Sequence, residues 1–233
     1  MKFIPFLFIF LLNTTFTFSQ IQGKISNATT KEPIPFVNIG ITKLAKGTVS
    51  DDFGNYELEA TAPTDTVTIS AIGFSTQKKT VKALLENGNI LLQQKIHEIK
   101  TVNLTATEFG NEKRFGKKNK NRGLSVGFGN RQLGCAIGSK ISIKKETYLK
   151  SANFKINHAE GDSLLFRVNI FHFEDGVVGE NILKKNIILS MPQKRGILTV
   201  DLTPYELIID HDVLLSLESV SYTHLTLPTT PYV

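Results

Sequence analysis

The chain has 233 residues, no Trp, 16 Phe, a single Cys and a formal net charge of +6. This length can bury one large or two small hydrophobic cores. The single cysteine, Cys135, excludes an internal disulfide framework, and we expect it to be a small buried hydrophobic residue. Six of the positive charges lie between Lys113 and Arg122. The rest of the chain is close to neutral, so a basic nucleic-acid-binding face on a folded domain is not indicated.

Residues 1–19 are typical of a signal peptide. Lys2 supplies a positive start, and Phe3–Leu12 is a continuous apolar run that is too short to span a membrane as a helix of about 20 residues. Thr17 and Ser19 favour cleavage before Gln20. We therefore expect an exported protein that is periplasmic, outer-membrane-associated or secreted, with no transmembrane segment in the mature chain.

Residues 20–107 are expected to form a first β-sandwich. Val37, Ile39 and Ile41 alternate with Asn38 and Gly40, the period of a half-buried strand. A long turn built on Gly, Asp and Asn residues is expected between Ile41 and Tyr56. The predicted strands are Ile21–Ser26, Pro35–Ile41, Tyr56–Ala60, Val67–Ala71, Thr76–Val81, Ile90–Leu92 and Lys100–Thr105, with one helical turn at Ala83–Asn87.

Four spaced motifs in this region carry a resemblance. The order Pro33–Ile39, Gly47–Asp51, Gly54–Tyr56 and Ile69–Phe74 resembles the carboxypeptidase-regulatory-like domain over about Ile21–Leu104. The resemblance implies a prealbumin-like β-sandwich, found in exported proteins of the Bacteroidetes alone, beside other β-domains, or ahead of TonB-dependent outer-membrane transporters. It implies no catalytic residue, since in the enzymes that name the family the peptidase chemistry lies in a different domain.

Residues 108–123 are predicted to be an interdomain linker. Glu108–Arg122 is nearly free of apolar residues and carries six basic ones, and like charges in a short run favour an extended, flexible chain. The alternative is a polybasic patch for an anionic glycan or lipid.

Residues 124–219 are expected to form a second β-sandwich, truncated at its end. Its strongest strand signal is Ser163–Phe173, with Phe166 and Val168 on one face and Arg167 and Asn169 on the other. Further strands are predicted at Cys135–Ile143, Tyr148–Ile156, Ile187–Leu189, Leu198–Leu202 and Val213–Leu217, with a turn at Asp175–Gly176. The region resembles the second β-domain of some exported Bacteroidetes proteins that begin with the same regulatory-like module. Together these patterns predict an all-β protein of two sandwich domains.

Residues 220–233 are interpreted as an artefactual tail. Val220–Thr230, VSYTHLTLPTT, resembles a translated transposon-end adapter, so we expect the genuine sequence to run to about Ser219. Prolines remove ladder donors, and Thr226–Val233 is expected to be exposed and to form no regular ladder.

Side chains suited to chemistry do not form a recognised constellation. The five histidines (His97, His158, His172, His211 and His224) lack metal-ligand spacing. Asp210-His211-Asp212 favours a loop that satisfies its own backbone over a cation or acid–base site. Asp51, Asp52 and Asn55 favour a turn over a calcium loop.

The remaining motifs also lack a clear functional signature. Gly127, Gly129 and Gly134 do not have phosphate-loop spacing. Asp65-Thr66-Val67 and Asp162-Ser163-Leu164 resemble an O-glycosylation acceptor pattern at Thr66 and Ser163, although a plain strand start is the favoured interpretation of both. We predict no catalytic, cofactor-binding or metal-binding residue and no cofactor, so the chain is not expected to be an enzyme.

The sequence favours a non-enzymatic exported binding or scaffold protein of the cell envelope. Its contact surfaces would be sheet faces and loops such as Lys43–Asn55, and its partner a protein or glycan of the envelope. The alternatives are an N-terminal fragment of a TonB-dependent transporter, whose barrel of about 22 strands does not fit here, or of a larger secreted hydrolase.

Overall fold

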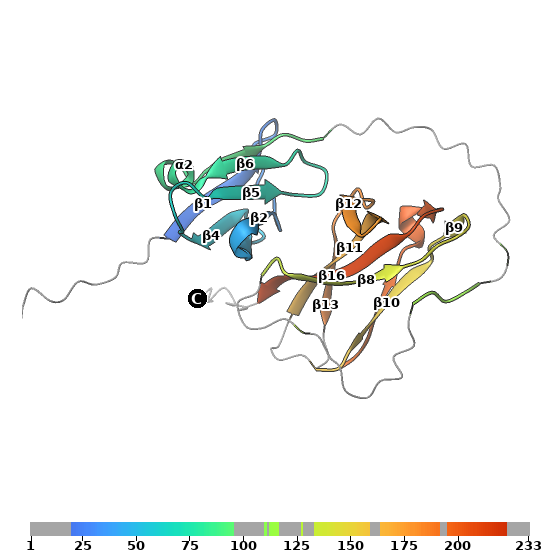
Figure 1. Cartoon of the computed structure of the whole chain (residues 1–233). Coiled ribbons are helices and arrows are strands. Elements are labelled where there is room, and N and C mark those ends of the chain that lie inside the picture. The colour runs from blue at the N-terminus through green and yellow to red at the C-terminus, as the bar shows by residue number, and fades with distance from the viewer. Residues whose placement is uncertain are drawn as a thin grey trace, which may run out of the picture.

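The computed structural model describes residues 20–95, 110, 112–116, 127, 133–158, 164–191 and 195–222, and these residues form two all-β domains (Figure 1). The sheets of both domains are open, none closing into a barrel. The predicted fold class, two all-β sandwiches, is therefore confirmed. No helix among the described residues has the length and apolar character needed to cross a membrane.

The first domain packs two sheets around a single apolar core. Its sheets have the strand orders β4-β1-β7 and β3-β2-β5-β6. The core takes alternate residues from both sheets, including Ile25 and Ile90 from one and Ile39 and Val67 from the other. The strands are β1 (Gln20–Asn27), β2 (Asn38–Ile41), β3 (Lys46–Val49), β4 (Asn55–Glu59), β5 (Thr66–Ser70), β6 (Gln77–Thr80) and β7 (Ile90–Leu92).

Strand β1 joins both flanks of its sheet. Its first half pairs antiparallel with β4, and its second half pairs parallel with β7. Helix α2 (Val81–Glu86) lies between β6 and β7, and the Thr80 hydroxyl caps it by accepting a hydrogen bond from Ala83 N. Val81 and Leu84 bury the inner face of this short helix.

Strand β3 corrects the expected long turn after Ile41. The chain reverses through the 3-10 turn η2 (Thr42–Leu44) and the left-handed residue Ala45, then pairs back along β2. Gly47 lies opposite Gly40 in this hairpin. The glycine that suggested a turn is therefore a strand residue, and neither glycine of the pair has a side chain. Strand β2 also begins later than predicted, at Asn38, because Phe36 has a φ of 57° and cannot continue an extended strand.

The second domain is built on the long antiparallel pair of β11 and β16, which are distant in sequence. Its main sheet has the order β12-β11-β16-β8, with β13 also paired to β11. A smaller pair, β10-β14, covers the core that includes Val168, Ile170 and Val200. The strands are β8 (Ala136–Ile141), β9 (Thr147–Tyr148), β10 (Ser151–Ile156), β11 (Leu164–Glu174), β12 (Val177–Asn181), β13 (Ile187–Met191), β14 (Gly196–Asp201), β15 (Ile208–Ile209) and β16 (Val213–Tyr222), with a 3-10 turn η3 (Thr203–Tyr205).

Several boundaries in this domain differ from those expected. The turn at Asp175–Gly176 is present, with φ values of 49° and 81°, but it leads into β12, a largely exposed strand with no clear alternation in its sequence. Strand β16 extends to Tyr222, three residues past the expected boundary at Ser219, because Ser221 and Tyr222 pair with Leu165 and Leu164. The signal peptide, the predicted strand Lys100–Thr105, most of the linker and Thr226–Val233 lie outside the described residues.

Candidate binding cleft beside the domain junction

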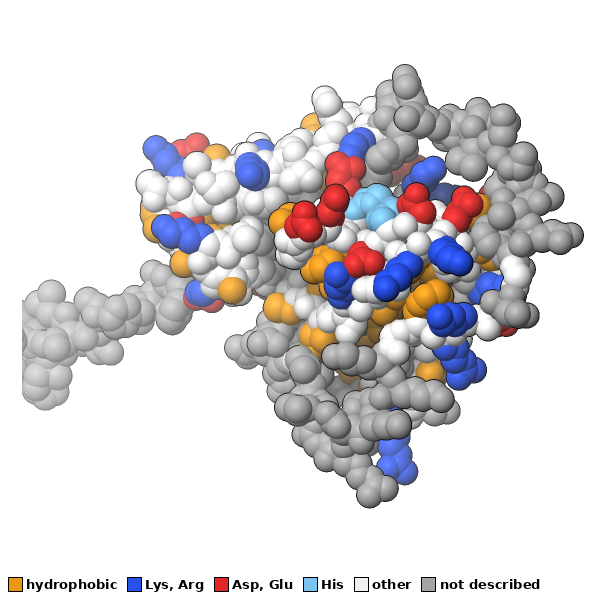
Figure 2. Space-filling model, turned by 45° about the vertical axis from the view of Figure 1, so that its right-hand side comes forward, with side chains coloured by type: hydrophobic (Ala, Val, Ile, Leu, Met, Phe, Trp, Pro, Cys, Tyr) orange, Lys and Arg blue, Asp and Glu red, His pale blue; other side chains and the backbone are white. Residues whose placement is uncertain are grey.

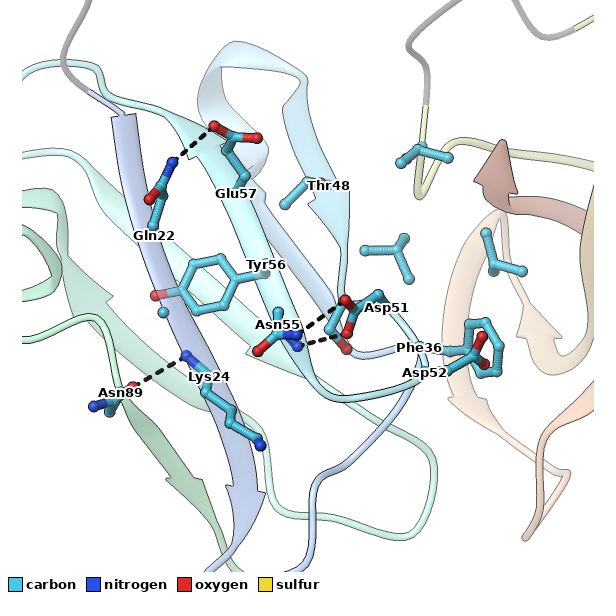
Figure 3. Close-up of a pocket in the computed structure, with 15 residues that line it drawn as sticks. Gln22, Lys24, Phe36, Thr48, Asp51, Asp52, Asn55, Tyr56, Glu57 and Asn89 are labelled. Atoms are coloured by element: carbon cyan, nitrogen blue, oxygen red, sulfur yellow. Dashed lines mark hydrogen bonds between the residues drawn. The ribbon is translucent and has the colours of Figure 1, made fainter. Parts of the chain in front are cut away.

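An open cleft of about 770 Å³ runs along the first domain where it meets the second (Figure 3). Strands β1, β3 and β4 and the turn between β3 and β4 supply most of its lining. Leu133 and Val220 border it from the second domain. The cleft therefore combines the central strand of one domain with a wall from the other.

Tyr56 is a buried residue of β4 that joins the cleft lining to the segment before β7. The side chain is buried, and its hydroxyl donates a hydrogen bond of 2.8 Å to the Gly88 carbonyl oxygen. Burial raises the pKa of Tyr56 to about 12 because the phenolate would lose its hydration. Tyr56 is thus a neutral structural support below strongly alkaline pH.

The turn at the cleft edge is organised by Asp51. One carboxylate oxygen accepts hydrogen bonds from Phe53 N (2.9 Å) and Asn55 N (2.8 Å), and the other accepts from Asn55 Nδ2 (3.0 Å). Gly54 completes the turn with a φ of 76°, where an added Cβ would lie 2.4 Å from the Ile25 carbonyl oxygen. The Asp51–Asn55 sequence therefore forms a self-satisfied turn, as a short Asx-type loop does.

The other polar side chains of the cleft differ in whether they have a hydrogen-bond partner among the described residues. Gln22 donates to Glu57 across the β1–β4 pair at 3.0 Å. Within the described part of the chain, the Asp52 carboxylate and the Lys24 ammonium have no hydrogen-bond or ion-pair partner, and both residues face the cleft (Figure 3). An unpaired cation and an unpaired carboxylate on an open surface suit the binding of a polar partner.

The Asp210-His211-Asp212 motif lies away from this cleft, in the second domain. His211 Nδ1 lies 2.7 Å from Asp210 Oδ1, and its ring stacks on His172 with centroids 4.4 Å apart. Asp212 instead accepts hydrogen bonds from Lys140 Nζ, Ile143 N and Ser142 Oγ. The motif thus joins the start of β16 to the loop after β8, and the side chain of Asp212 accepts from the backbone of that loop rather than from its own.

Hydrogen bonds lower the pKa values of both carboxylates of this motif. The hydrogen bond from Lys140 is the main cause that lowers the pKa of Asp212, and the hydrogen bond to His211 is the main cause that lowers the pKa of Asp210. Figure 2 shows histidine side chains on this face among acidic and basic side chains of both signs. Among the described residues, no group of three or more His, Cys, Asp or Glu side chains could hold a metal ion.

The other predicted positions are dispersed. Cys135 is exposed, so the expectation of a buried residue was wrong: it lies just before β8, the strand at one side of the main sheet, and its carbonyl oxygen accepts from Ser219 N. Gly134 lies against β3 of the first domain. Thr66 is exposed at the start of β5. His97, His224, Gly129 and Ser163 lie outside the described residues.

Sequence reasoning missed the burial of Arg167. Its alternation with the core residues of β11 correctly placed it on the outer face of the sheet, where solvent is the usual environment. The side chain is nevertheless 2% exposed, and its partner Glu218 is 4% exposed. The nearby apolar sequence offers no signal for this, since the covering atoms come from the first domain.

The comparison with known families agrees with the architecture of the first domain. The family model described as CarboxypepD_reg-like domain matches residues 21–104, which include the described strands of that domain except for Gln20, the first residue of β1. No curated protein matches the chain. Residues 21–104 of this chain match the CarboxypepD_reg-like domain family.

Proposed function

We propose that this chain is a non-enzymatic exported binding or scaffold protein of the bacterial cell envelope, and that its partner binds in the cleft beside the domain junction. The observation that carries the proposal is the cleft itself, which places on an open surface the Lys24 and Asp52 side chains, neither of which has a polar partner among the described residues. The matched family is regulatory-like rather than catalytic, which supports a role in binding.

The chemistry of the cleft favours a polar partner over an apolar one. Lys24 provides a donor, Asp52 provides an acceptor, and Asn89 lines the cleft beside Lys24, with its Oδ1 accepting from Lys24 N at 3.1 Å. The lining is open rather than enclosed, so a chain-like partner can extend through it. A glycan or a peptide segment of an envelope protein has the required hydrogen-bonding groups.

Binding can be tested with the purified mature protein and two defined probes. The probes are a soluble muropeptide mixture and the oligosaccharide released from lipopolysaccharide, and the readout is the shift of backbone amide NMR signals. We expect shifts at Lys24, Asp52 and Asn89, lost in Lys24→Ala and Asp52→Ala but kept in the control Lys155→Ala, an exposed residue of the second domain that does not line the cleft. Shifts elsewhere, or no shifts with either probe, would reject the cleft as a glycan-binding site.

Export and absence of catalysis need separate measurements. Fractionation of producing bacteria is expected to recover the protein outside the cytoplasm with its N-terminus at Gln20. Cytoplasmic protein that retains Met1 would contradict export. Zinc-dependent release of C-terminal residues from peptides, abolished by chelation, would contradict the non-enzymatic assignment.

A further inference from the structure

We infer that the Arg167–Glu218 ion pair is an interdomain lock, which fixes the second domain to Phe36 and Asn38 of the CarboxypepD_reg-like domain so that both move as one body. This inference does not depend on the cleft being a binding site. It concerns the relative position of the domains, which the basic sequence of the linker alone would leave free.

The lock begins with a buried two-point ion pair on the second domain. Arg167 on β11 donates through Nη2 to Glu218 Oε1 at 2.6 Å and through Nε to Glu218 Oε2 at 3.0 Å. Both residues lie opposite each other on the antiparallel β11–β16 pair. The two parallel hydrogen bonds hold the guanidinium plane in one orientation.

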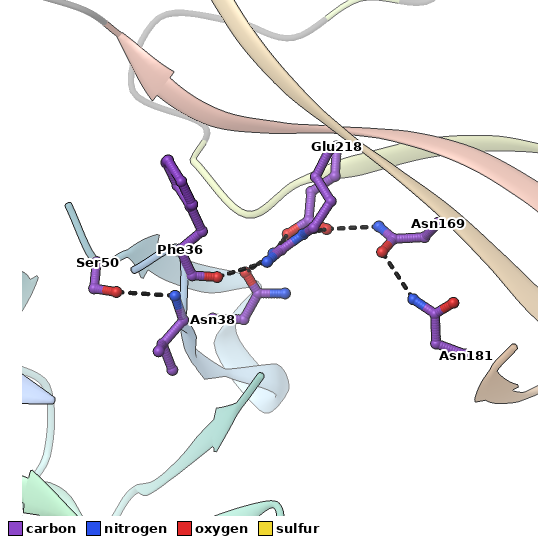
Figure 4. Close-up of polar contacts among 8 residues, drawn as sticks. Phe36, Asn38, Ser50, Asn169, Asn181 and Glu218 are labelled. Atoms are coloured by element: carbon purple, nitrogen blue, oxygen red, sulfur yellow. Dashed lines mark hydrogen bonds and ion pairs between the residues drawn. The ribbon is translucent and has the colours of Figure 1, made fainter. Parts of the chain in front are cut away.

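The remaining donors of that plane point at the other domain. Arg167 Nη1 donates to the Phe36 carbonyl oxygen, and Nη2 donates to Asn38 Oδ1, each at 2.5 Å. Figure 4 shows the Phe36 carbonyl and the Asn38 side chain beside Glu218, with the Phe36 ring pointing away from it. One guanidinium therefore binds a carboxylate of its own domain and two oxygen atoms of the first domain at once.

The acceptors on the first domain are held in place by Ser50. Its hydroxyl accepts from Val37 N at 2.9 Å and donates to the Ile34 carbonyl oxygen at 3.1 Å. This clamps the backbone on both sides of Phe36, whose φ of 57° is uncommon for a residue with a side chain. The Phe36 carbonyl is thus presented on a fixed segment.

The carboxylate side of the lock is also held. Asn169 Nδ2 donates to Glu218 Oε2 at 2.7 Å, and Asn181 Nδ2 donates to Asn169 Oδ1 at 2.9 Å. Asn181 Oδ1 accepts in turn from Leu183 N at 3.0 Å. A continuous polar chain therefore runs from the first-domain segment to the loop after β12 (Figure 4).

Contacts on either side make this a surface rather than a single point. Lys95 of the first domain forms an ion pair of 3.1 Å with Glu180. A Cβ on Gly134 would lie 3.4 Å from Val49 Cγ2, so the chain before β8 packs closely on β3. These contacts flank Arg167 along the same junction and restrict rotation about it.

The chemistry of the pair favours orientation as its role. A buried ion pair gains little net stability over apolar residues of the same volume, but an Arg left without acceptors is costly. Arg167 satisfies its outward donors only when Phe36 and Asn38 stand in one position. The lock is therefore selective for one domain arrangement.

The arrangement can be tested on the mature chain by pulsed electron spin resonance. Spin labels at Lys82→Cys and Lys155→Cys, exposed positions on different domains, report the interdomain distance after Cys135→Ser removes the native thiol. We expect a narrow distance distribution for the labelled parent. The double variant Arg167→Met with Glu218→Met should broaden it at least twofold, since the apolar pair keeps the second domain folded but offers no donor to Phe36 or Asn38.

Two further variants keep the test decisive. Asn38→Ala leaves the Arg167–Glu218 pair intact and removes one first-domain acceptor, so it should broaden the distribution even if the double variant fails to fold. Lys144→Met removes an exposed positive charge from the second domain and should leave the distribution unchanged. A broad distribution in the parent, or one that stays narrow in Asn38→Ala and the double variant alike, would overturn the inference.

Discussion

Gly23 of β1 and Gly88 before β7 touch backbone to backbone: a Cβ on Gly23 would lie 2.0 Å from the Gly88 carbonyl oxygen. The contact closes the first domain where β1 passes from its partner β4 to its partner β7. The carbonyl involved is the one that accepts the hydrogen bond from Tyr56. Two glycines from opposite ends of the domain thus allow three strands and the tyrosine to meet.

Gly23→Ala is therefore expected to lower the free energy of unfolding by about 1–3 kcal/mol, the usual cost of overpacking. The atoms nearest the added Cβ are backbone atoms of Gly88, which cannot move aside as the end of a flexible side chain can. The free energy of unfolding in urea measures the effect. Gly40→Ala is the matched control, because its Cβ would meet the nearest atom at an ordinary 3.5 Å; equal losses in both variants would contradict the close contact as the cause.

Tyr56→Phe removes the hydrogen bond to Gly88 and should cost about 1 kcal/mol at neutral pH. In alkali the unfolded tyrosine ionises near its ordinary pKa of 10, before the folded residue does at about 12. Stability of the parent should thus fall as pH rises from 10 towards 12. Urea unfolding across this range should show that the decline is weaker in Tyr56→Phe.

Tyr148→Phe provides a comparison for the neutral-pH loss. Its hydroxyl donates to the Thr203 carbonyl oxygen at 3.1 Å in an exposed setting, where water can replace the lost bond. We expect a smaller loss than for Tyr56→Phe. A larger one would mean that the buried hydroxyl is not a main support of the cleft.

Asp51→Ala should lower the free energy of unfolding by about 1–2 kcal/mol, because two backbone N–H groups and one side-chain amide lose their acceptor. Asp52→Ala removes the adjacent carboxylate, which holds no such bonds in the described structure, and should change stability little. Thermal unfolding of both variants, with and without millimolar calcium, separates a turn from a cation site. A calcium-dependent rise in the melting temperature that Asp51→Ala abolishes would contradict the turn assignment.

Cys135 is expected to react fully with a thiol reagent in the folded protein, since its side chain is exposed before β8. The measurement is the number of thiols per protein molecule that react with the reagent in buffer, compared with the number that react in denaturant. Equal stoichiometry and a rapid reaction in buffer are expected. Reaction only after unfolding would restore the burial that the sequence suggested.

The strands with regular alternation were the predictable part of the fold. Val67 and Ile69 of β5, and Phe166 and Val168 of β11, face their cores as the period of two requires. Short strands without this pattern were missed, such as β12 with its exposed Val177 and Val178. Gly47 shows the second kind of error, in which a residue tolerated by turns is used for close strand pairing.

The cleft could be anticipated only in part. The region Lys43–Asn55 was named as a contact loop, and residues Thr48 to Asp52 do line the cleft. The walls contributed by Leu133 and Val220 depend on how the two domains meet. That arrangement rests on Arg167 and Asn38, which lie 129 positions apart, and no local pattern in either segment records the pairing.

Limited digestion tests the basic linker. Residues 112–116 are exposed, and Lys113 and Arg114 are among them, so trypsin should cut first between Lys113 and Arg122. The two β-sandwiches should then persist as folded fragments, identified by mass spectrometry and circular dichroism. Substituting the six basic residues of this segment by Gln should slow the first cut at least tenfold while leaving the unfolding curve unchanged. First cuts within Ile34–Leu58, the segment of β2, β3 and β4, would instead show that this part of the first domain opens more readily than the linker, and the domain boundary would have to be moved.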